Sequence, residues 1–542
     1  MKNKIVLSDW YLKINRLNYE SAVKVPHTWN VCEETQYYKG KAEYSTVFFA
    51  DKDLKNKRVS LHFAAVYHTA VVYVNEKYIG THSGSGYTPF KFDITDAVFF
   101  GNENKIKVIA DNKPGKNMLP YMKKFDWADD GGLIREVSVV FSEPGGLENV
   151  FISPLLTCIE NGFCNGYLDL KFEFNDLHKN DIAKLVLSEY KTDQTVLTVD
   201  AVQIENNCAS IHFENLKVWD FENPNLYNLA VTIKDNTFTQ RFGLRTIRVS
   251  ENYIFLNNKP VYLTGCEWMP GSHPDYGMAE PIEHSVKCLK QIKDSGCRFT
   301  RFHWQQDSRI YDWCDENGLL VQEEIPYWGA PGKATSKQLK IAKMQADEMV
   351  DAHFNHPSIV FWGVGNELGG FYKATQKYVK DMVAYFKDKD RTRLVNYVSN
   401  TLGSLRKRQT DATLFGDVAM WNEYLGLWQP CGNISEKISE VNNRCLERPL
   451  IITEFGLCEP FFKGGDERRI QILLDHTAAF NEADKIQGYV WFSLNDYRTH
   501  VGEEGSGRFR QRVHGSTDLY GNQKPSYDVL CEVNARQIKM HK

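Results

Sequence analysis

The sequence predicts two β-sandwiches followed by a (β/α)8 barrel, and three observations lead to that fold class. With 542 residues, the chain is too long for one ordinary domain. Short runs that alternate apolar and polar residues fill its first part, as the strands of sandwiches do. In its second part, apolar runs alternate with amphipathic segments of helical period, as in a barrel of parallel strands.

The first predicted domain, residues 1–144, has the strand spacing of a β-sandwich. Alternating segments at 42–49, 59–63 and 70–74 are typical of short strands between turns. Pro144-Gly-Gly146 then interrupts the pattern, which marks the first domain boundary.

The second predicted domain, residues 145–247, is again rich in strands. About 100 residues of this pattern fit an immunoglobulin-like sandwich. The strand candidates lie at 167–174, 183–190, 209–213 and 227–233.

The third predicted domain, residues 248–542, has the order of a (β/α)8 barrel. Amphipathic helices are expected at 283–295, 336–354 and 371–386, between apolar strands. A doubly wound open sheet is the alternative, but no Gly-rich phosphate loop follows the first strand. The eight strand candidates lie at 261–265, 297–303, 319–324, 359–365, 394–399, 414–421, 450–454 and 488–494.

Composition and charge argue against several classes of protein. A net charge of −4 is unlike a nucleic-acid-binding protein, which usually carries a basic face. No run approaches the roughly 18 apolar residues of a membrane span, and the apolar run near the N-terminus is too short for a signal peptide. The 12 cysteines are scattered singly, without zinc or disulfide spacing. We therefore expect a cytoplasmic protein with free thiols.

Two glutamates stand at the ends of apolar strands in the predicted barrel. Residues 359–365 lead into Asn366 and Glu367, and residues 450–453 lead into Glu454. Active residues of such barrels lie at the carboxyl ends of the strands. An Asn-Glu pair occurs five times in this chain, so the pair alone says nothing. Its place after the fourth strand, with a glutamate ending the seventh, makes the pattern specific.

Two carboxyl groups that converge over one cavity suit the cleavage of a glycosidic bond. One group protonates the leaving oxygen while the other attacks the anomeric carbon, and a separation of about 5–5.5 Å gives net retention. Burial and the neighbouring negative charge would raise the pKa of one group and keep it protonated near neutrality. We predict Glu367 as the acid/base and Glu454 as the nucleophile of a retaining glycosidase.

Several motifs of the chain occur together in one known family. Phe361-Trp-Gly-Val-Gly-Asn-Glu367 and Ile452-Thr-Glu454-Phe-Gly456 contain the two glutamates, while Val25-Pro-His-Thr-Trp29, Phe242-Gly-Leu-Arg245 and Asn257-Asn-Lys-Pro260 lie outside them. With these motifs the chain resembles glycoside hydrolase family 2, the group of β-galactosidases, β-glucuronidases and β-mannosidases. The resemblance covers nearly the whole chain. It implies a jelly-roll, sugar-binding-type first domain and an exo-acting enzyme for terminal β-linked sugars.

The resemblance implies roles for residues near the two glutamates. Asn366 would bond the sugar 2-hydroxyl, and Tyr424 would donate a hydrogen bond to the nucleophile. His303 would contact the sugar ring. Arg301 would orient a catalytic carboxylate through a bidentate pair, with an ordinary core ion pair as the alternative.

Further implied contacts to the sugar come from other segments. Asn422 would touch the sugar, and Asp126 would reach it from a loop of the first domain, unless it is a surface acid. Trp491, near the end of the eighth strand, would form an apolar wall for the ring, with a barrel-core position as the alternative.

Two segments depart from the family pattern. Many members carry Arg-His-Glu after the first barrel strand, where this chain has Gly265-Cys-Glu267-Trp268, so Glu267 is expected to reshape the sugar pocket. The Asn-x-Lys pair of β-glucuronidases is missing from the region after the eighth strand. Arg508, Arg510 and Arg512 stand there, either as a uronate site or, as is commoner, as a solvated basic loop.

The simplest expectation is a β-galactosidase-like enzyme. β-Glucuronidase and activity on mannosides, galactofuranosides or arabinosides are alternatives, as is an endo-acting enzyme of the same barrel type. A carbohydrate-binding pseudoenzyme is the alternative from another class. We expect a small-molecule or oligosaccharide substrate, no nucleic-acid or membrane partner and no required cofactor. The sequence does not assign a Mg²⁺ or Na⁺ site, and it leaves open whether the protein is a homo-oligomer.

Overall fold

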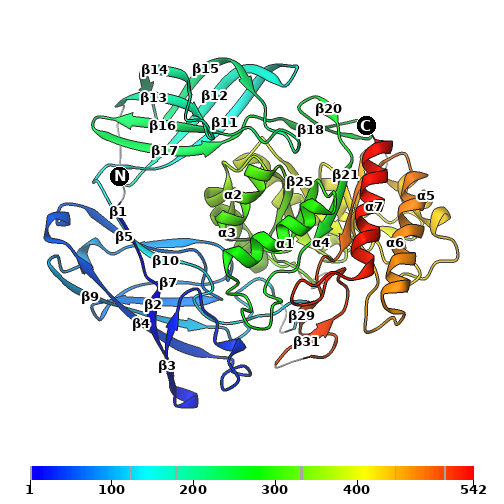
Figure 1. Ribbon diagram of the computed structural model, residues 1–542, viewed down its shortest axis with the longest axis horizontal. Coiled ribbons are helices and arrows are strands. Elements are labelled where there is room, and N and C mark those ends of the chain that lie inside the picture. The colour runs from blue at the N-terminus through cyan, green and yellow to red at the C-terminus, as the bar shows by residue number, and fades with distance from the viewer. Residues whose placement is uncertain are drawn as a thin grey trace.

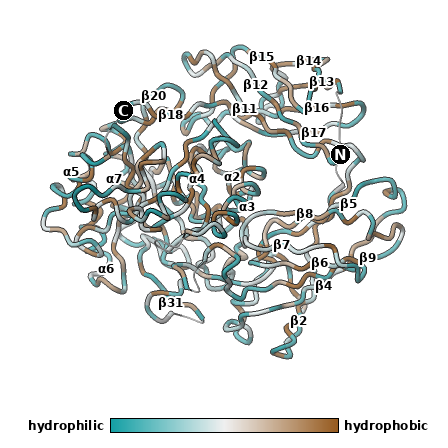
Figure 2. Tube along the Cα trace, turned by 180° about the vertical axis from the view of Figure 1, so that it is seen from behind, coloured by the Kyte–Doolittle hydropathy of each residue, from teal (hydrophilic) through white to brown (hydrophobic). Residues whose placement is uncertain are grey.

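The computed structural model describes residues 3–121, 124–176, 181–329, 334–445, 447–505 and 508–541. It contains two β-sandwiches and a closed barrel, which confirms the predicted fold class (Figure 1). Figure 2 shows the molecule from behind, with hydrophilic and hydrophobic residues interspersed along the elements. Among the described helices, none combines the length and the apolar character that crossing a bilayer requires.

The first sandwich packs a six-stranded sheet against a four-stranded sheet, both antiparallel. Every second residue of β5 and β6 is buried, so Val59, Leu61 and Phe63 contribute to one apolar core with Val72. The large sheet has the order β3 (Tyr19–Lys24), β2 (Asp9–Ile14), β4 (Lys41–Ala50), β9 (Asn102–Asp111), β6 (Thr69–Val74) and β7 (Lys77–His82). The small sheet has the order β1 (Asn3–Val6), β10 (Val137–Ser142), β5 (Arg58–Phe63) and β8 (Phe90–Asp93).

The second sandwich has a three-stranded and a four-stranded antiparallel sheet, as an immunoglobulin-like domain does. Alternate residues of β12 and β16 are buried between the sheets. The first sheet has the order β11 (Leu147–Glu160), β12 (Phe163–Phe174) and β15 (Cys208–Lys217). The second has the order β14 (Thr195–Ile204), β13 (Asp181–Glu189), β16 (Tyr227–Ile233) and β17 (Asn236–Phe242).

A small sheet of β18 (Ile247–Ser250), β19 (Tyr253–Leu256) and β20 (Lys259–Pro260) precedes the barrel. Ile254 and Leu256 of β19 belong to one buried cluster with Phe299 and Leu320, at the start of two barrel strands. The small sheet therefore packs against the amino ends of the barrel strands and leaves the carboxyl ends free for a site.

The barrel closes through parallel pairing of its first and last strands. Its strands are buried throughout, which is why they read as continuous apolar runs. The strands are β21 (Leu263–Glu267), β22 (Phe299–Phe302), β23 (Leu320–Glu324), β24 (Ile359–Asn366), β25 (Leu394–Ser399), β26 (Ala419–Asn422), β27 (Leu450–Phe455) and β28 (Ile486–Phe492). The helices are α1 (Ile282–Asp294), α2 (Ser308–Asn317), α3 (Ser336–His353), α4 (Lys373–Lys389), α5 (Ile434–Arg444), α6 (Gly465–Asn481) and α7 (Pro525–Met540).

The sixth barrel strand is shorter than the sequence predicts. The first half of the predicted strand at 414–421 is wrong, because Ala412–Phe415 forms a 3₁₀ turn and β26 begins at Ala419. The side chain of Asp411 caps this turn by accepting a hydrogen bond from the backbone of Thr413. A local cap therefore outweighs the apolar strand pattern here.

The loop between β9 and β10 connects the first sandwich to the mouth of the barrel. Arg135 donates to the backbone oxygen of Gln305, after β22, over 2.6 Å. Asp130 forms an ion pair with Arg498 in β29 (Tyr497–Thr499), at 2.9 Å. β29 belongs to a small sheet with β31 (Arg510–Arg512) and β30 (Glu503–Glu504). These contacts place a loop of the first sandwich beside the carboxyl ends of the barrel strands.

Candidate active site

A cavity of about 590 Å³ opens at the carboxyl ends of the barrel strands. Glu367 and Glu454 both line it, as do Asn422 and Tyr424. Asp126 lines it from the loop between β9 and β10. The two glutamates that follow apolar strands in the sequence therefore face one cavity.

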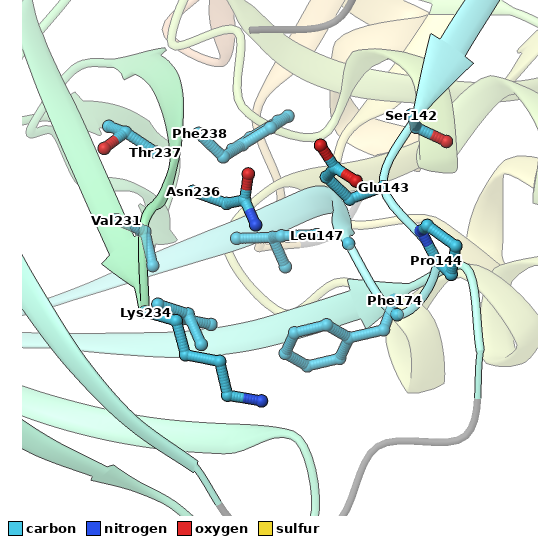
Figure 3. A pocket seen from close by; sticks show the side chains of 13 residues that line it. Ser142, Glu143, Pro144, Leu147, Phe174, Val231, Lys234, Asn236, Thr237 and Phe238 are labelled. Carbon is cyan, nitrogen blue, oxygen red and sulfur yellow. The ribbon is translucent and has the colours of Figure 1, made fainter. Parts of the chain in front are cut away.

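A second, smaller hollow of about 140 Å³ lies where β10 of the first sandwich leads into β11 of the second (Figure 3). Leu147, Phe174 and Val231 are among its lining residues, and Glu143 is the one carboxylate among the described ones. A single carboxyl group cannot act as both acid and nucleophile. This hollow is therefore not a candidate catalytic centre.

Glu367 comes directly after β24, with its backbone in the left-handed region (φ +55°). This conformation is unusual for a residue with a side chain and is found at functional sites where surrounding contacts hold it. Asn422 donates to Oε1 of Glu367 over 2.9 Å, and the indole N–H of Trp328 donates to Oε2 over 3.1 Å. Both carboxyl oxygens therefore have a fixed position.

Glu454 lies in β27 and accepts hydrogen bonds on both oxygens. Arg301 donates to Oε1 over 2.8 Å, and Nε2 of His303 lies 3.3 Å from the same oxygen. The phenol of Tyr424 donates to Oε2 over 2.8 Å. Two cationic side chains and one hydroxyl thus stabilise the charged form of this carboxylate.

The two glutamates have pKa values on opposite sides of the ordinary value. Burial, followed by the nearby charge of Glu454, raises the pKa of Glu367 to about 7. Burial would also raise the pKa of Glu454, but the hydrogen bond from His303 and the charge of Arg301 outweigh it and lower this pKa to about 2. Near neutrality, one carboxyl group can hold a proton while the other is an anion, as double displacement requires.

A largely buried network, in which His303 also lines the cavity, keeps Glu454 charged. Burial by itself lowers the pKa of His303, but the carboxylate of Glu267 raises it to about 10, so the imidazole stays protonated. Arg301 also contacts Glu267, at 3.4 Å, and forms a bidentate pair with Glu324, at 3.1 and 3.3 Å. The predicted bidentate pair of Arg301 thus goes to Glu324, and Glu454 receives a single bond.

The structure places Glu267 and Asn366 below the cavity surface. Glu267 is fully buried and bonds His303, so it does not reshape the sugar pocket by direct contact, and that expectation is wrong. Asn366 is also buried, with Nδ2 3.3 Å from Nε2 of His303, and it accepts a bond from Asn422 over 3.0 Å. Asn422 itself lines the cavity.

Trp491 does not form a wall of the cavity. Its side chain is completely buried, donates to Oγ of Ser516 over 3.0 Å and packs edge-on against Phe455. Phe492, one residue later, lines the cavity instead. Successive side chains of a strand point to opposite faces, so a shift of one residue exchanges the core for the cavity.

The sequence analysis gave a solvated basic loop as the commoner outcome for the three arginines after β28. Two of the three are instead paired with carboxylates. Arg508 is buried against Asp129, at 2.9 Å, and Arg512 pairs with Asp126, at 2.9 Å, and lines the cavity. Only Arg510 is exposed. Residues 506 and 507 of this loop lie outside the described residues. The acidic loop of the first sandwich attracts the two buried arginines.

Asp126 lies in the cavity as predicted, held by three donors. Tyr497 donates to it over 3.1 Å and Thr499 over 2.7 Å, in addition to Arg512. The alternative of a free surface acid is therefore excluded.

Sequence reasoning missed several residues that line the cavity. Trp328 follows β23 closely, so the rule that places active residues after barrel strands identifies it in retrospect. The sequence contains no comparable signal for Trp428, Phe492 or His514. Their position depends on loop paths and strand register.

Two groups of side chains have metal-ligand spacing in the described part of the chain. One is Glu267, His303 and Glu454, but Arg301 already bonds both of its carboxylates. The other contains Asp312 and Asp315, which both pair with Arg241, together with His356. In both groups, a guanidinium supplies the positive charge.

We expect kcat/KM to fall above about pH 7, because Glu367 must hold its proton to act as an acid, whereas Glu454 stays ionised down to about pH 2. Trp328→Phe removes a donor that favours the charged form of Glu367, so its pKa should rise further. The alkaline limb of the pH profile of kcat/KM should therefore move to higher pH. Trp313→Phe, on α2, is the control and should leave the limb in place. If the alkaline limb of Trp328→Phe stays at the same pH or moves to lower pH, Glu367 is not the group that it reports.

A closed barrel whose mouth holds two carboxyl groups with pKa values held apart has the arrangement of a glycoside hydrolase. Three models of one family match the chain. They are "Glycosyl hydrolases family 2, sugar binding domain" at residues 3–142, "Glycosyl hydrolases family 2" at 165–245 and the family 2 "TIM barrel domain" at 247–492. The chain belongs to glycoside hydrolase family 2, which confirms the resemblance drawn from its motifs.

Curated relatives are named for two different activities. A β-galactosidase of Thermoanaerobacterium thermosulfurigenes is 29% identical over 94% of this chain and 72% of its own length. A putative β-glucuronidase of Formosa agariphila is 32% identical over 67% of this chain, and this match spans 44% of its length.

Solved structures share the whole fold. A β-glucuronidase from an uncultured Clostridium has a TM-score of 0.86 at 21% identity, over 99% of this chain and 98% of its own. A β-galacturonidase from Eisenbergiella tayi, bound to galacturonate, has a TM-score of 0.83 at 23% identity, over 99% of this chain and 97% of its own. At this level of identity, the likeness concerns the fold.

Proposed function

We propose that this protein is an exo-acting β-glycosidase that works by double displacement with retention. Glu367 protonates the leaving oxygen while a carboxylate oxygen of Glu454 attacks the anomeric carbon, so the glycosidic C–O bond breaks and a glycosyl–enzyme ester forms. Glu367, now charged, takes a proton from water, whose oxygen attacks the anomeric carbon and releases Glu454.

One observation carries this proposal: Glu367 and Glu454 line the same cavity, and their pKa values lie on opposite sides of the ordinary value. The Glu367 pKa of about 7 and the Glu454 pKa of about 2 match an acid and a nucleophile. A carbohydrate-binding pseudoenzyme has no need for such a separation, so the geometry favours catalysis.

The contacts around the mouth of the cavity support exo action. The loop that carries Asp126 and the sheet of β29 to β31 meet at one side of the mouth, joined by Arg512 and Thr499. A site that is walled on one side takes the end of a sugar chain rather than its middle. Asp126 would accept hydrogen bonds from hydroxyl groups of the terminal sugar.

We propose a β-D-galactoside as the first candidate substrate, supported by the β-galactosidase among the relatives. A panel of 4-nitrophenyl β-glycosides with galactose, glucuronic acid, galacturonic acid, mannose, galactofuranose and arabinose tests this choice. NMR of the first product should show the β-anomer. Release of the α-anomer would exclude retention. If the protein hydrolyses no glycoside of the panel, the proposed exo-β-glycosidase activity is wrong.

A β-linked uronide is the second candidate, favoured by Arg512 in the cavity wall. Its Nε bonds Asp126, and a guanidinium has further N–H groups in a fork that matches a carboxylate. Arg512→Gln should lower kcat/KM for a nitrophenyl uronide about 10- to 100-fold more than for the galactoside, because bonds to charged groups contribute about 1.5–3 kcal/mol. Arg510→Gln is the exposed control. An equal loss for both sugars would rule out uronate recognition by Arg512.

The residues named above supply every proton and charge of the two steps, so we propose that the reaction requires no cofactor. We also propose a cytoplasmic location, because the 12 cysteines are scattered singly as in proteins of reducing compartments.

A further inference from the structure

Glu423 and His476 form a buried pair of ionisable side chains that the reaction steps above do not use. Glu423 comes directly after β26, and His476 lies in α6. Both side chains are buried, and neither is among the described residues that line the cavity. Nδ1 of His476 donates to Oε1 of Glu423. The pair therefore lies behind the wall of the cavity rather than in it.

The imidazole and the carboxylate of this pair stabilise each other. Burial by itself lowers the pKa of His476, but the carboxylate of Glu423 outweighs it and raises this pKa above the ordinary value. The surroundings of the imidazole are apolar, since the rings of Phe455 and Phe480 lie beside it, with centroids 6.1 and 6.4 Å away. Removing one partner would leave the other charge buried without compensation. The pair therefore fixes Glu423 to α6.

The carboxylate of Glu423 also holds the backbone that carries Tyr424. Its second oxygen, Oε2, accepts the backbone N–H of Leu425 over 2.8 Å. The backbone N–H of Glu423 itself donates to the carbonyl oxygen of Glu454 over 2.8 Å. Tyr424 thus lies just beyond the end of β26, between two residues whose backbone N–H groups are both bonded.

Both chain neighbours of this carboxylate contact a catalytic carboxyl group. The phenol of Tyr424 donates to Glu454 over 2.8 Å, and the amide of Asn422 donates to Glu367 over 2.9 Å. Asn422 has further support, because Thr453 donates to its amide oxygen over 2.9 Å. Among the described residues, the phenol of Tyr424 has Glu454 as its one hydrogen-bond partner. The direction of this phenol therefore depends on the backbone that carries it.

We propose that Glu423 and His476 are positioning residues that hold the phenol of Tyr424 against the nucleophile. Helix α6 anchors the pair, the pair fixes the turn after β26, and the turn directs the hydroxyl to Oε2 of Glu454. The hydroxyl in turn orients the carboxylate that attacks the anomeric carbon. This role rests on the proposed double displacement, in which Glu454 is the nucleophile.

Glu423→Ala should lower the rate of glycosyl–enzyme formation about 10- to 100-fold, because a misplacement of about 1 Å can cost that much. The substrate is a 2,4-dinitrophenyl 2-deoxy-2-fluoro glycoside of the sugar identified by the nitrophenyl panel. Its fluorine disfavours the oxocarbenium-like transition states, so the ester on Glu454 is long-lived. One dinitrophenolate is then released per competent site. The amount released counts folded sites, and the time course gives the rate per site.

A double-mutant cycle with Tyr424→Phe separates positioning from a general structural role. Tyr424→Phe alone removes the hydroxyl that the pair directs and should slow ester formation by a similar factor. In that background, Glu423→Ala should add at most about 2-fold, the usual scatter of additive effects. If the two losses multiply instead, Glu423 does not act through Tyr424.

Variants of His476 give a rescue and a matched control. His476→Asn keeps an N–H donor near the place of Nδ1 and should retain most of the rate per site. His476→Leu removes the donor and should lose about as much as Glu423→Ala. His353→Leu is the control, because His353 in α3 forms a second buried pair with Glu323 of β23, at 2.9 Å. It should keep the rate per site even if fewer molecules fold.

The outcomes separate the positioning role from the proposed function. If Glu423→Ala and His476→Leu keep the rate per site of the unmodified protein, or if His353→Leu loses as much as they do, the pair positions nothing, although the glycosidase assignment stands. If the unmodified protein cleaves no aryl glycoside, the proposed function fails and the positioning role fails with it. Should Glu423→Ala not fold, equal rates per site in His476→Asn and His476→Leu would still overturn the role.

Discussion

Glu454→Ala should lower turnover of aryl β-glycosides by at least about 10⁴-fold, the scale seen when a covalent nucleophile is removed. The carboxylate is ionised across the working pH range because His303 and Arg301 hold its pKa at about 2. Without it, no glycosyl–enzyme ester forms. Steady-state assays with 4-nitrophenyl glycosides measure the loss, and mass spectrometry of the unmodified protein with a slow substrate should detect the ester on Glu454.

Added azide sharpens this test. In Glu454→Ala, the small anion should enter the space left by the carboxylate, attack from that side and give a glycosyl azide of inverted configuration. Glu467→Ala, an exposed acid on α6, should keep full activity. If Glu454→Ala retains a tenth of the activity or more, Glu454 is not the nucleophile.

Glu367→Ala should have an effect that depends on the leaving group. General acid catalysis contributes about 10²- to 10⁴-fold, so kcat/KM for a phenyl glycoside should fall by that amount. The 2,4-dinitrophenolate leaving group departs without a proton, so turnover of a 2,4-dinitrophenyl glycoside should lose far less activity in this first step. The alkaline limb near pH 7 should disappear from the remaining activity, since it reports the ionisation of Glu367.

The products separate the two glutamates. With azide, Glu367→Ala should yield a glycosyl azide of retained configuration, because Glu454 still forms the ester and azide replaces water in the second step. A loss that is equal for phenyl and dinitrophenyl glycosides would show that Glu367 is not the proton donor. Glu436→Ala, on α5, is a suitable control.

Periodicity located most of the fold. The sandwiches were predicted from alternating apolar residues, as in β5 and β6, and the barrel from continuous apolar runs, as in β24 and β27. The structure buries alternate residues in the first two strands and every residue in the other two. The pattern failed at the sixth barrel strand. There, Asp411 caps a 3₁₀ turn, and a single hydrogen bond to a neighbouring backbone group is invisible to periodicity.

The position of a site residue was predictable from the sequence only where the end of its own strand places it at the mouth of the barrel. Glu367 directly follows β24 and Glu454 is the last but one residue of β27, so their place at the mouth came from local sequence. Trp491 and Phe492 show the limit, because register alone decides which of two adjacent aromatic residues faces the cavity. The sequence analysis expected Glu267 in the sugar pocket. Its buried carboxylate instead pairs with His303 and raises the pKa of that imidazole.

By itself, the sequence determined the fold class, the family and the two carboxyl groups at strand ends, because these depend on patterns within short segments. The tertiary structure alone decided the pairing of Asp126 with Arg512 and the support of Glu454 by His303 and Arg301. Asp126 and Arg512 are 386 positions apart in the chain. A pKa or a cavity wall depends on which distant side chains become neighbours, and that is set only when the domains pack.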